Sequence, residues 1–329
     1  MRVLLCTSMM ATAMAAAAVA RERPPIIDMH LHAHPLADYG GGPSVCMSDE
    51  PMEFHAPGWG QPITVESIMT CKSPVKPAAS DEAVMRESLG LVDDYNITAI
   101  TSGSLETVER WKKHLPRRVV PAISFLTDEK RSPEELRALY RAGRFKVFAE
   151  IGAQYRGLSL DDPSLEPYFA LAEEEGIPVG VHLGEGPPGG IHVGGNPDYR
   201  VALGHPLQLE PVLVRHPKLR LYVMHFGSPF VDEMIALMYS HPQVYIDIAQ
   251  NNWGFPRAHF YSQLERFLDA GFGKRILWGS DQMVWPRAIE VAIETVEKAP
   301  FLTRAQKRDI FYNNAVRFLG GDPAGDTIQ

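Results

Sequence analysis

The chain has 329 residues, a formal net charge of −8 at pH 7 and a hydrophobic fraction of 45%. A mildly acidic balance gives no whole-chain attraction for nucleic acid or for an anionic membrane, which disfavours those two classes of partner. The hydrophobic fraction suffices for a large buried core, and the length fits one α/β barrel with an insertion.

The first twenty residues have the features of a secretory signal peptide. Arg2 supplies a positive start, residues 3–19 are apolar and rich in alanine, and Ala18-Val19-Ala20 is a small-residue cleavage site. The run is too short and too alanine-rich for a stable membrane anchor. We expect residues 21–329 to form the mature domain, with a net charge of −9 because Arg2 is the only charge removed. We expect the mature protein to be exported to a bacterial periplasm.

Residues 33–80 are rich in Gly and Pro and show little periodicity, so we expect a long loop after the first strand. A loop of this length in a compact domain is usually functional, often as a lid. It contains Cys46 and Cys71, an even pair that suggests a disulfide in an exported protein. Two free thiols are the alternative, and the spacing matches no thiolate zinc site.

Eight apolar, β-branched segments alternate with helical patterns along the rest of the chain. Such an alternation predicts a parallel sheet, and eight strands close a (β/α)8 TIM barrel of the α/β class, here as a single domain. Capping boxes at Ser132 with Glu135 and at Thr303 with Gln306 indicate two helix starts. The expected strands are 26–32, 95–101, 119–125, 144–151, 177–182, 219–225, 244–248 and 275–281, and the expected helices include 81–94, 106–114, 133–143, 165–175, 206–215, 229–239 and 262–270.

The first strand ends in His30 and His32, which are two residues apart. Residues at that spacing point to the same face of a strand, so two imidazoles can enter one space. Catalytic groups of such barrels lie at the carboxyl ends of strands. Taken singly, each of these residues could be structural, but six at matching positions predict a metal site. The other four candidates at or near strand ends are Glu150, His182, His225 and Asp281.

Three motifs resemble the amidohydrolase superfamily, and in particular its amidohydrolase 2 branch of metal-dependent hydrolases with a TIM-barrel fold. They are Asp28-x-His30-x-His32, then Trp278-Gly279-Ser280-Asp281, which is similar to the last strand of that branch, and Asn314-Ala315-x-Arg317-x-x-Gly320, which is similar to its usual ending. The resemblance covers nearly the whole mature chain apart from residues 33–80.

The resemblance implies that His30, His32 and Asp281 bind one metal, and that His182 and His225 help to form the site. Glu150 resembles the strand-four Glu that bridges two metals in TatD-like and phosphotriesterase-like members. Many amidohydrolase 2 members, including the carboxymuconate-semialdehyde decarboxylase type, hold one metal without it. We favour two divalent ions but leave one ion open, and expect zinc, although manganese or iron would also fit.

The function that follows is a metal-dependent hydrolase of a small carbonyl compound such as a lactone, amide or ester. Metal-activated hydroxide would attack, Asp281 would act as proton shuttle, and His225 or His182 would assist by hydrogen bonding. The alternatives are a metal-dependent decarboxylase of the same branch, a TatD-like phosphodiesterase, which the acidic charge disfavours, and an exported binding protein that kept a metal site.

Loops after the strands should supply the contacts to a small-molecule substrate. Arg156 and Arg257 offer guanidinium groups that would clamp a carboxylate, although a solvated surface position is the simpler interpretation for each. The sequence leaves the substrate and the oligomeric state open, a homo-oligomer included. The expected substrate contacts are Tyr155, Arg156, Asn251, Trp253 and Arg257.

Overall fold

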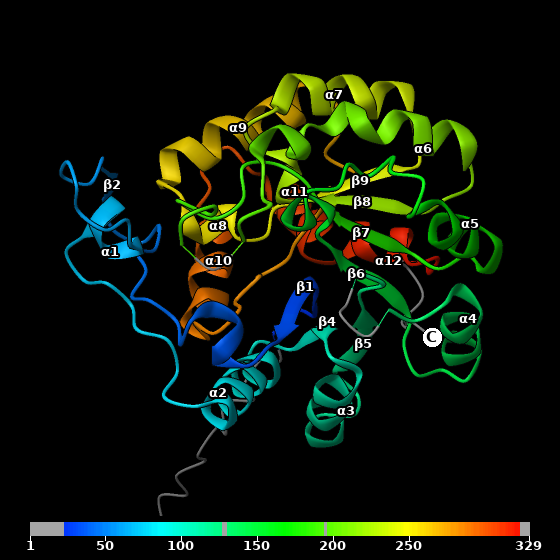
Figure 1. The fold of residues 1–329 in the computed structure, drawn as a ribbon, viewed down its shortest axis with the longest axis horizontal. Helices are drawn as coiled ribbons and strands as arrows, with labels where there is room; N and C mark the ends of the chain where they lie inside the picture. The colour runs from blue at the N-terminus through cyan, green and yellow to red at the C-terminus, as the bar shows by residue number, and fades with distance from the viewer. Residues whose placement is uncertain (1–22, 127–129, 194–195, 323–329) are drawn as a thin grey trace, which may run out of the picture.

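The computed structural model describes residues 23–126, 130–193 and 196–322. Eight parallel strands form one sheet that curves into a barrel, with helices packed around it (Figure 1). The predicted (β/α)8 architecture is confirmed, while the predicted signal peptide lies outside the described residues. In sheet order the strands are β1 (Ile26–Ala33), β4 (Ile97–Gly103), β5 (Val119–Ile123), β6 (Val147–Ile151), β7 (Val179–His182), β8 (Leu221–Met224), β9 (Val244–Asp247) and β10 (Ile276–Leu277).

The helices follow the expected alternation, and both predicted capping boxes are confirmed. The largest difference in a helix start is at α9, which begins at Arg257 directly after Pro256 rather than near Ser262. The predicted helix 206–215 also divides into the 3-10 turn Pro206–Leu209 and α6, which begins at Glu210. The α-helices after the insertion are α2 (Asp81–Asp94), α3 (Leu105–His114), α4 (Pro133–Arg141), α5 (Glu166–Glu175), α6 (Glu210–Arg215), α7 (Val231–Ser240), α8 (Asn251–Gly254), α9 (Arg257–Asp269), α10 (Arg287–Glu297), α11 (Arg304–Arg308) and α12 (Asn314–Phe318). The shorter turns are η1 (Leu36–Tyr39), η2 (Ala153–Arg156), η3 (Val201–Gly204), η4 (Pro206–Leu209), η5 (His225–Gly227) and the π-helical η6 (Asp309–Asn313).

The barrel closes between β1 and the segment after β10. The amide of Met29 donates to the carbonyl of Trp278 at 3.0 Å, and the amide of Asp281 donates to the carbonyl of His30 at 2.6 Å. The side chain of Asp28 completes the seam, because its Oδ1 accepts from the amides of His30 at 2.9 Å and Ser280 at 3.0 Å. The first Asp of the Asp-x-His-x-His motif therefore joins the first strand to the last.

Apolar residues close the end of the barrel opposite to the carboxyl ends of the strands. Ala315, Val316 and Phe318 of α12 pack there against buried strand residues such as Ile27 and Leu277. A larger apolar cluster fills the layer between the strands and the surrounding helices. Apolar packing thus closes this end of the barrel, while the candidate site residues lie at the other.

The loop after β1 carries a small antiparallel hairpin of β2 (Met52–Phe54) and β3 (Met69–Cys71), with α1 (Val65–Ile68) before β3. It stands out from one side of the barrel (Figure 1). The disulfide between Cys46 and Cys71 is confirmed and ties this insertion together. No helix in the described ranges is both long enough and apolar enough to cross a bilayer.

Candidate metal centre

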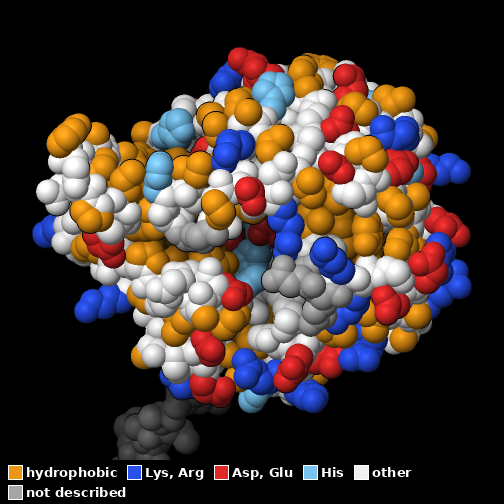
Figure 2. Space-filling model, viewed as in Figure 1, with side chains coloured by type: hydrophobic (Ala, Val, Ile, Leu, Met, Phe, Trp, Pro, Cys, Tyr) orange, Lys and Arg blue, Asp and Glu red, His pale blue; other side chains and the backbone are white. Residues whose placement is uncertain are grey.

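A cavity of about 1220 Å³ opens at the carboxyl ends of the strands. Figure 2 shows it as a hollow near the middle of the face, with histidine at its floor. The β1 loop and its hairpin form one wall, to which Cys46, Val65 and Met69 contribute. Five of the six predicted site residues line its floor, and His30 is buried directly against them. We call the six residues the mouth cluster: His30, His32, Glu150, His182, His225 and Asp281.

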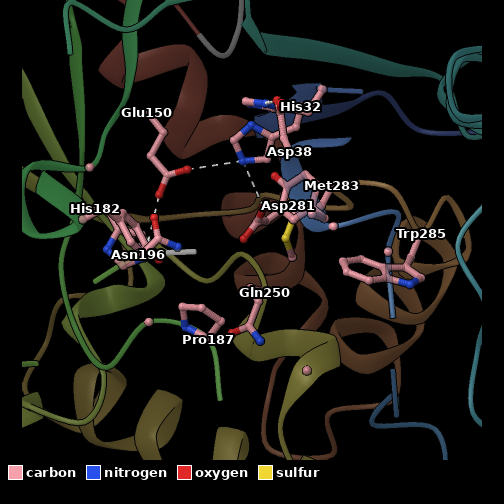
Figure 3. Close-up of a pocket in the computed structure, with 18 of the residues that line it drawn as sticks. His32, Asp38, Glu150, His182, Pro187, Asn196, Gln250, Asp281, Met283 and Trp285 are labelled. Atoms are coloured by element: carbon pink, nitrogen blue, oxygen red, sulfur yellow. Dashed lines mark hydrogen bonds and ion pairs between the residues drawn. The ribbon is translucent and has the colours of Figure 1, made fainter. Parts of the chain in front are cut away.

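Glu150 lies at the centre of the mouth cluster. Its Oε2 is 3.4 Å from Nε2 of His30 and 3.3 Å from Nε2 of His32. Its Oε1 is 3.6 Å from Nε2 of His225 and 3.8 Å from Nε2 of His182. Figure 3 shows the carboxylate between His32 and His182. The two oxygens of one residue therefore face two different pairs of histidines.

Asp281 lies closest to the first of these pairs, and its Oδ2 is also 4.0 Å from Nδ1 of His225. Its Oδ1 lies 3.0 Å from Nε2 of His32 and 3.8 Å from Nε2 of His30 (Figure 3). The sequence placed Asp281 at the end of a strand, but β10 stops at Leu277 and Asp281 follows in irregular backbone with φ of 45°. His225 likewise follows β8 rather than ending it, with φ of 58°. Non-glycine residues with such φ values are strained and concentrate at functional sites.

Hydrogen bonds from the ring nitrogen Nδ1 to the protein scaffold orient three of the four histidines. Nδ1 of His30 lies 3.0 Å from Oδ2 of Asp247, and Nδ1 of His32 lies 2.8 Å from the hydroxyl of Ser102. Nδ1 of His225 donates to the carbonyl of Ala249 at 3.0 Å. When the scaffold binds Nδ1, Nε2 is left to face the cavity, which is how metal-binding histidines are usually held. His182 has no such anchor within the described structure, since its buried Nδ1 lacks a hydrogen-bond partner.

The second residue of the Trp-Gly-Ser-Asp motif must be glycine for a steric reason. A Cβ on Gly279 would lie 2.7 Å from Cβ of His30, closer than real Cβ atoms come. The motif therefore makes room for a site histidine as well as carrying Asp281.

The charges of the mouth cluster stabilise one another. Burial opposes ionisation of Glu150, but hydrogen bonds from His225, His30 and His32 outweigh it and hold its pKa well below the usual range. Burial also opposes protonation of His30, yet the carboxylates of Asp281 and Asp247 raise its pKa well above the usual value.

His182 differs from its neighbours. Burial, and then the charge of His225, lower the pKa of His182 to about 3, so it is neutral in ordinary buffers. A neutral imidazole is the form that can bind a metal.

The donor set fits a divalent cation. Three triads of ligand atoms lie within 4.8 Å of one another: His30 with His225 and Asp281, His30 with His32 and Glu150, and Glu150 with His182 and His225. Imidazole nitrogens and carboxylates are the ligands of zinc, manganese and iron in proteins. Two buried carboxylates among histidines are also costly without positive charge, which a metal would supply.

The predicted substrate contacts divide into two groups. Tyr155, Arg156, Asn251 and Trp253 line the cavity. Arg257 does not line it, because it opens α9 and lies in the helix layer, with Nε and Nη2 buried and lacking a hydrogen-bond partner among the described residues.

Two residues that orient the site were not singled out from the sequence. Asp247 holds His30 and also accepts from the amides of His225 at 2.9 Å and Ala249 at 3.0 Å. Ser102 holds His32. A carboxylate closing the apolar run of β9 was a usable signal for Asp247, whereas a serine at the end of β4 carries none.

Comparisons with known proteins agree with this geometry. The family model described as Amidohydrolase (Amidohydro_2) matches residues 27–321. No curated protein matches the chain.

Several solved structures share the fold at low sequence identity. An uncharacterised TIM-barrel protein from Bordetella bronchiseptica is 21% identical with a TM-score of 0.56, over 74% of this chain and 86% of its own. A probable 2-pyrone-4,6-dicarboxylic acid hydrolase from Acinetobacter baumannii, with citric acid bound, is 15% identical with a TM-score of 0.57, over 90% and 99%. A 5-carboxyvanillate decarboxylase from Sphingomonas paucimobilis is 17% identical with a TM-score of 0.50, over 70% and 81%.

Proposed function

The chain belongs to the amidohydrolase family, and from this premise we propose that it hydrolyses a small carbonyl compound, such as a lactone, an ester or an amide. The observation that carries the proposal is the position of Glu150, whose two oxygens face two histidine pairs, next to the carboxylate of Asp281. Tyr155, Arg156, Asn251 and Trp253 then form the cavity wall next to the reacting group.

His30, His32 and Asp281 would hold one divalent ion, and Glu150, His182 and His225 offer donor atoms for a second. Zinc is the expected ion for these ligands. A bound divalent metal lowers the pKa of a coordinated water toward neutrality and polarises a substrate carbonyl.

Asp281 is the residue to which we assign proton transfer. Burial opposes its ionisation, but the charge of His30 and a hydrogen bond from His32 lower its pKa, so it is a carboxylate at neutral pH. In this form it accepts the proton of the attacking water and passes it to the leaving group. His225 assists from the opposite side, where its Nε2 faces the cavity and its Nδ1 is fixed by Ala249.

Decarboxylation is the second candidate, and the shared fold of the 5-carboxyvanillate decarboxylase supports it. Glu150 favours hydrolysis, because decarboxylases of the one-metal type manage without a carboxylate at this position. The disulfide supports our further proposal that the chain is exported to an oxidising compartment, where such bonds persist.

The test combines metal content with turnover. Protein purified without chelator should contain at least one divalent ion per chain by elemental analysis, and should hydrolyse members of a panel of lactones, esters and amides. Chelation should abolish the activity and zinc should restore it. Release of CO2 from aromatic carboxylic acids without any hydrolysis would favour the decarboxylase. No bound metal after reconstitution with zinc or manganese would refute the metal centre.

A further inference from the structure

His182 uses its ring nitrogens differently from the other three histidines of the mouth cluster. Its Nε2 is hydrogen-bonded to the hydroxyl of Tyr155 at 2.9 Å. The same Nε2 is the nitrogen that faces Glu150, at 3.8 Å from Oε1. In the other three, the scaffold binds Nδ1 and leaves Nε2 directed into the cluster. In His182 a side chain of the cavity wall already occupies the nitrogen that a metal would need.

One nitrogen cannot serve both partners. An imidazole nitrogen carries either a hydrogen or a single in-plane lone pair, so it makes one strong directed contact. If Nε2 of His182 accepts from the Tyr155 hydroxyl, its lone pair is used, and if it donates to that hydroxyl, it has no lone pair. In either tautomer a metal can bind Nε2 of His182, the nitrogen that faces Glu150, only after Tyr155 has moved away.

The position of Tyr155 is built into the fold. The ring packs against His182 with centroids 4.8 Å apart and against Tyr199 at 5.4 Å. Gly152 gives it room, since a Cβ there would lie 2.8 Å from Cδ2 of Tyr155. The tyrosine also lines the cavity, so it can leave His182 without opening the apolar core.

The other half of the cluster carries no such competitor among the described residues. Nε2 of His30 and Nε2 of His32 lie 3.1 Å apart, within hydrogen-bond distance of each other, and both face the carboxylates of Glu150 and Asp281. A cation entering there displaces a proton from the imidazole nitrogens but no side chain, and it meets the negative charge of the two carboxylates. The two halves of the cluster should therefore differ in how readily they take up a metal.

We infer that Tyr155 competes with a metal ion for His182, so that the half formed by His30, His32 and Asp281 fills first. The half formed by His182 and His225 fills only when Tyr155 leaves. Tyr155 then sets how many ions the centre holds at a given metal concentration. This inference rests on the proposed function, because it takes the mouth cluster to be a metal centre.

The experiment is a calorimetric titration of the metal-free protein with zinc, which needs no knowledge of the substrate. Wild type should bind one zinc tightly and a second more weakly. Tyr155→Phe keeps the ring and removes the hydroxyl, so it should bind the second zinc about three- to tenfold more tightly and the first unchanged. His182→Gln should lose the second step and keep the first.

Tyr199→Phe is the matched control. Tyr199 packs on Tyr155, but its hydroxyl donates to the carbonyl of Glu185 rather than to a histidine. Its titration should match wild type. Equal tightening in Tyr199→Phe and Tyr155→Phe would overturn the inference, because loosened aromatic packing would then be the cause.

Three results separate the inference from the proposed function. A Tyr155→Phe titration identical to wild type at both steps overturns the inference and leaves the metal centre standing. A wild-type protein that takes up no zinc removes the metal centre and the inference together. Binding of two zinc ions by His182→Gln with wild-type affinities also overturns the inference, since His182 would then not be a ligand.

Discussion

One buried histidine of the described residues lies outside the mouth cluster, and its contacts with two glutamates make a useful comparison. His216 follows α6, with Nε2 2.9 Å from Oε1 of Glu166 and Nδ1 3.1 Å from Oε2 of Glu173. Both glutamates lie on α5 and have further partners, in Arg215 and in the amide of Lys218. We call these three residues, His216, Glu166 and Glu173, the helix-layer cluster.

The two clusters contain the same residue types but use the histidine nitrogens differently. In the helix-layer cluster both nitrogens of His216 are taken by protein groups, so no lone pair is left for a ligand. In the mouth cluster, His30, His32 and His225 each give one nitrogen to the scaffold and direct the other to a shared space. Residue type alone therefore does not mark a metal centre. The number of nitrogens left unused by the scaffold does.

The strongest test of this contrast is Asp281→Asn. Asparagine keeps the size and the backbone contacts but cannot accept a proton, so turnover should fall by about 10²- to 10⁴-fold. The fold should persist by circular dichroism, and at least one metal should remain through His30, His32 and Glu150. Full activity in this variant would remove Asp281 from the mechanism.

Asp247→Asn tests whether the scaffold prepares the histidine nitrogens. Oδ1 of Asp247 accepts from two backbone amides, which would fix the asparagine oxygen there and turn its NH2 toward Nδ1 of His30. His30 would then carry its proton on Nε2 and lose the inward lone pair. Metal affinity should drop by about 10- to 100-fold in a zinc titration. Glu173→Gln in the helix-layer cluster is the control and should bind zinc as wild type does. Equal affinities for Asp247→Asn and wild type would contradict the orienting role.

The sequence predicts the barrel and the residues of the mouth cluster, but not the helix-layer cluster. The strand pattern predicts the barrel, and the spacing of His30 and His32 predicts a shared direction, because both follow from local periodicity. The disulfide follows from an even pair of cysteines in one loop. These signals are local, so folding does not alter them.

The features of the site that the sequence does not predict depend on contacts between distant segments. Asp281 lies beyond a strand only two residues long, since the side chain of Asp28 replaces part of the ladder there. Asp247 orients His30 from 217 positions away. Arg257, a predicted substrate contact, is the first residue of α9 and does not line the cavity. No window of neighbouring residues contains this information.

His216→Gln tests the role of the helix-layer cluster. Glutamine cannot bond to both glutamates in the same way, so the free energy of unfolding in urea should fall by about 1 to 2 kcal/mol. Because His216 has no unused nitrogen, zinc content and turnover should stay at the wild-type level. A loss of metal in this variant would show that the helix-layer cluster supports the centre and is not independent of it.

The smallest expected effect is a pH dependence of the helix-layer cluster. Burial opposes ionisation of Glu166 and Glu173, but Arg215 and His216 for the first, and Lys218 and His216 for the second, outweigh it and lower both pKa values. A carboxylate with a lowered pKa stabilises the fold above the pKa of the unfolded chain, about 4.3, and loses that contribution as the pH falls through its folded-state pKa. The difference in Tm between metal-free wild type and His216→Gln should therefore be full near pH 5.5 and shrink toward pH 3. The mouth cluster titrates equally in both proteins and cancels from this difference. A gap that stays constant down to pH 3 would mean that His216 does not stabilise the ionised glutamates.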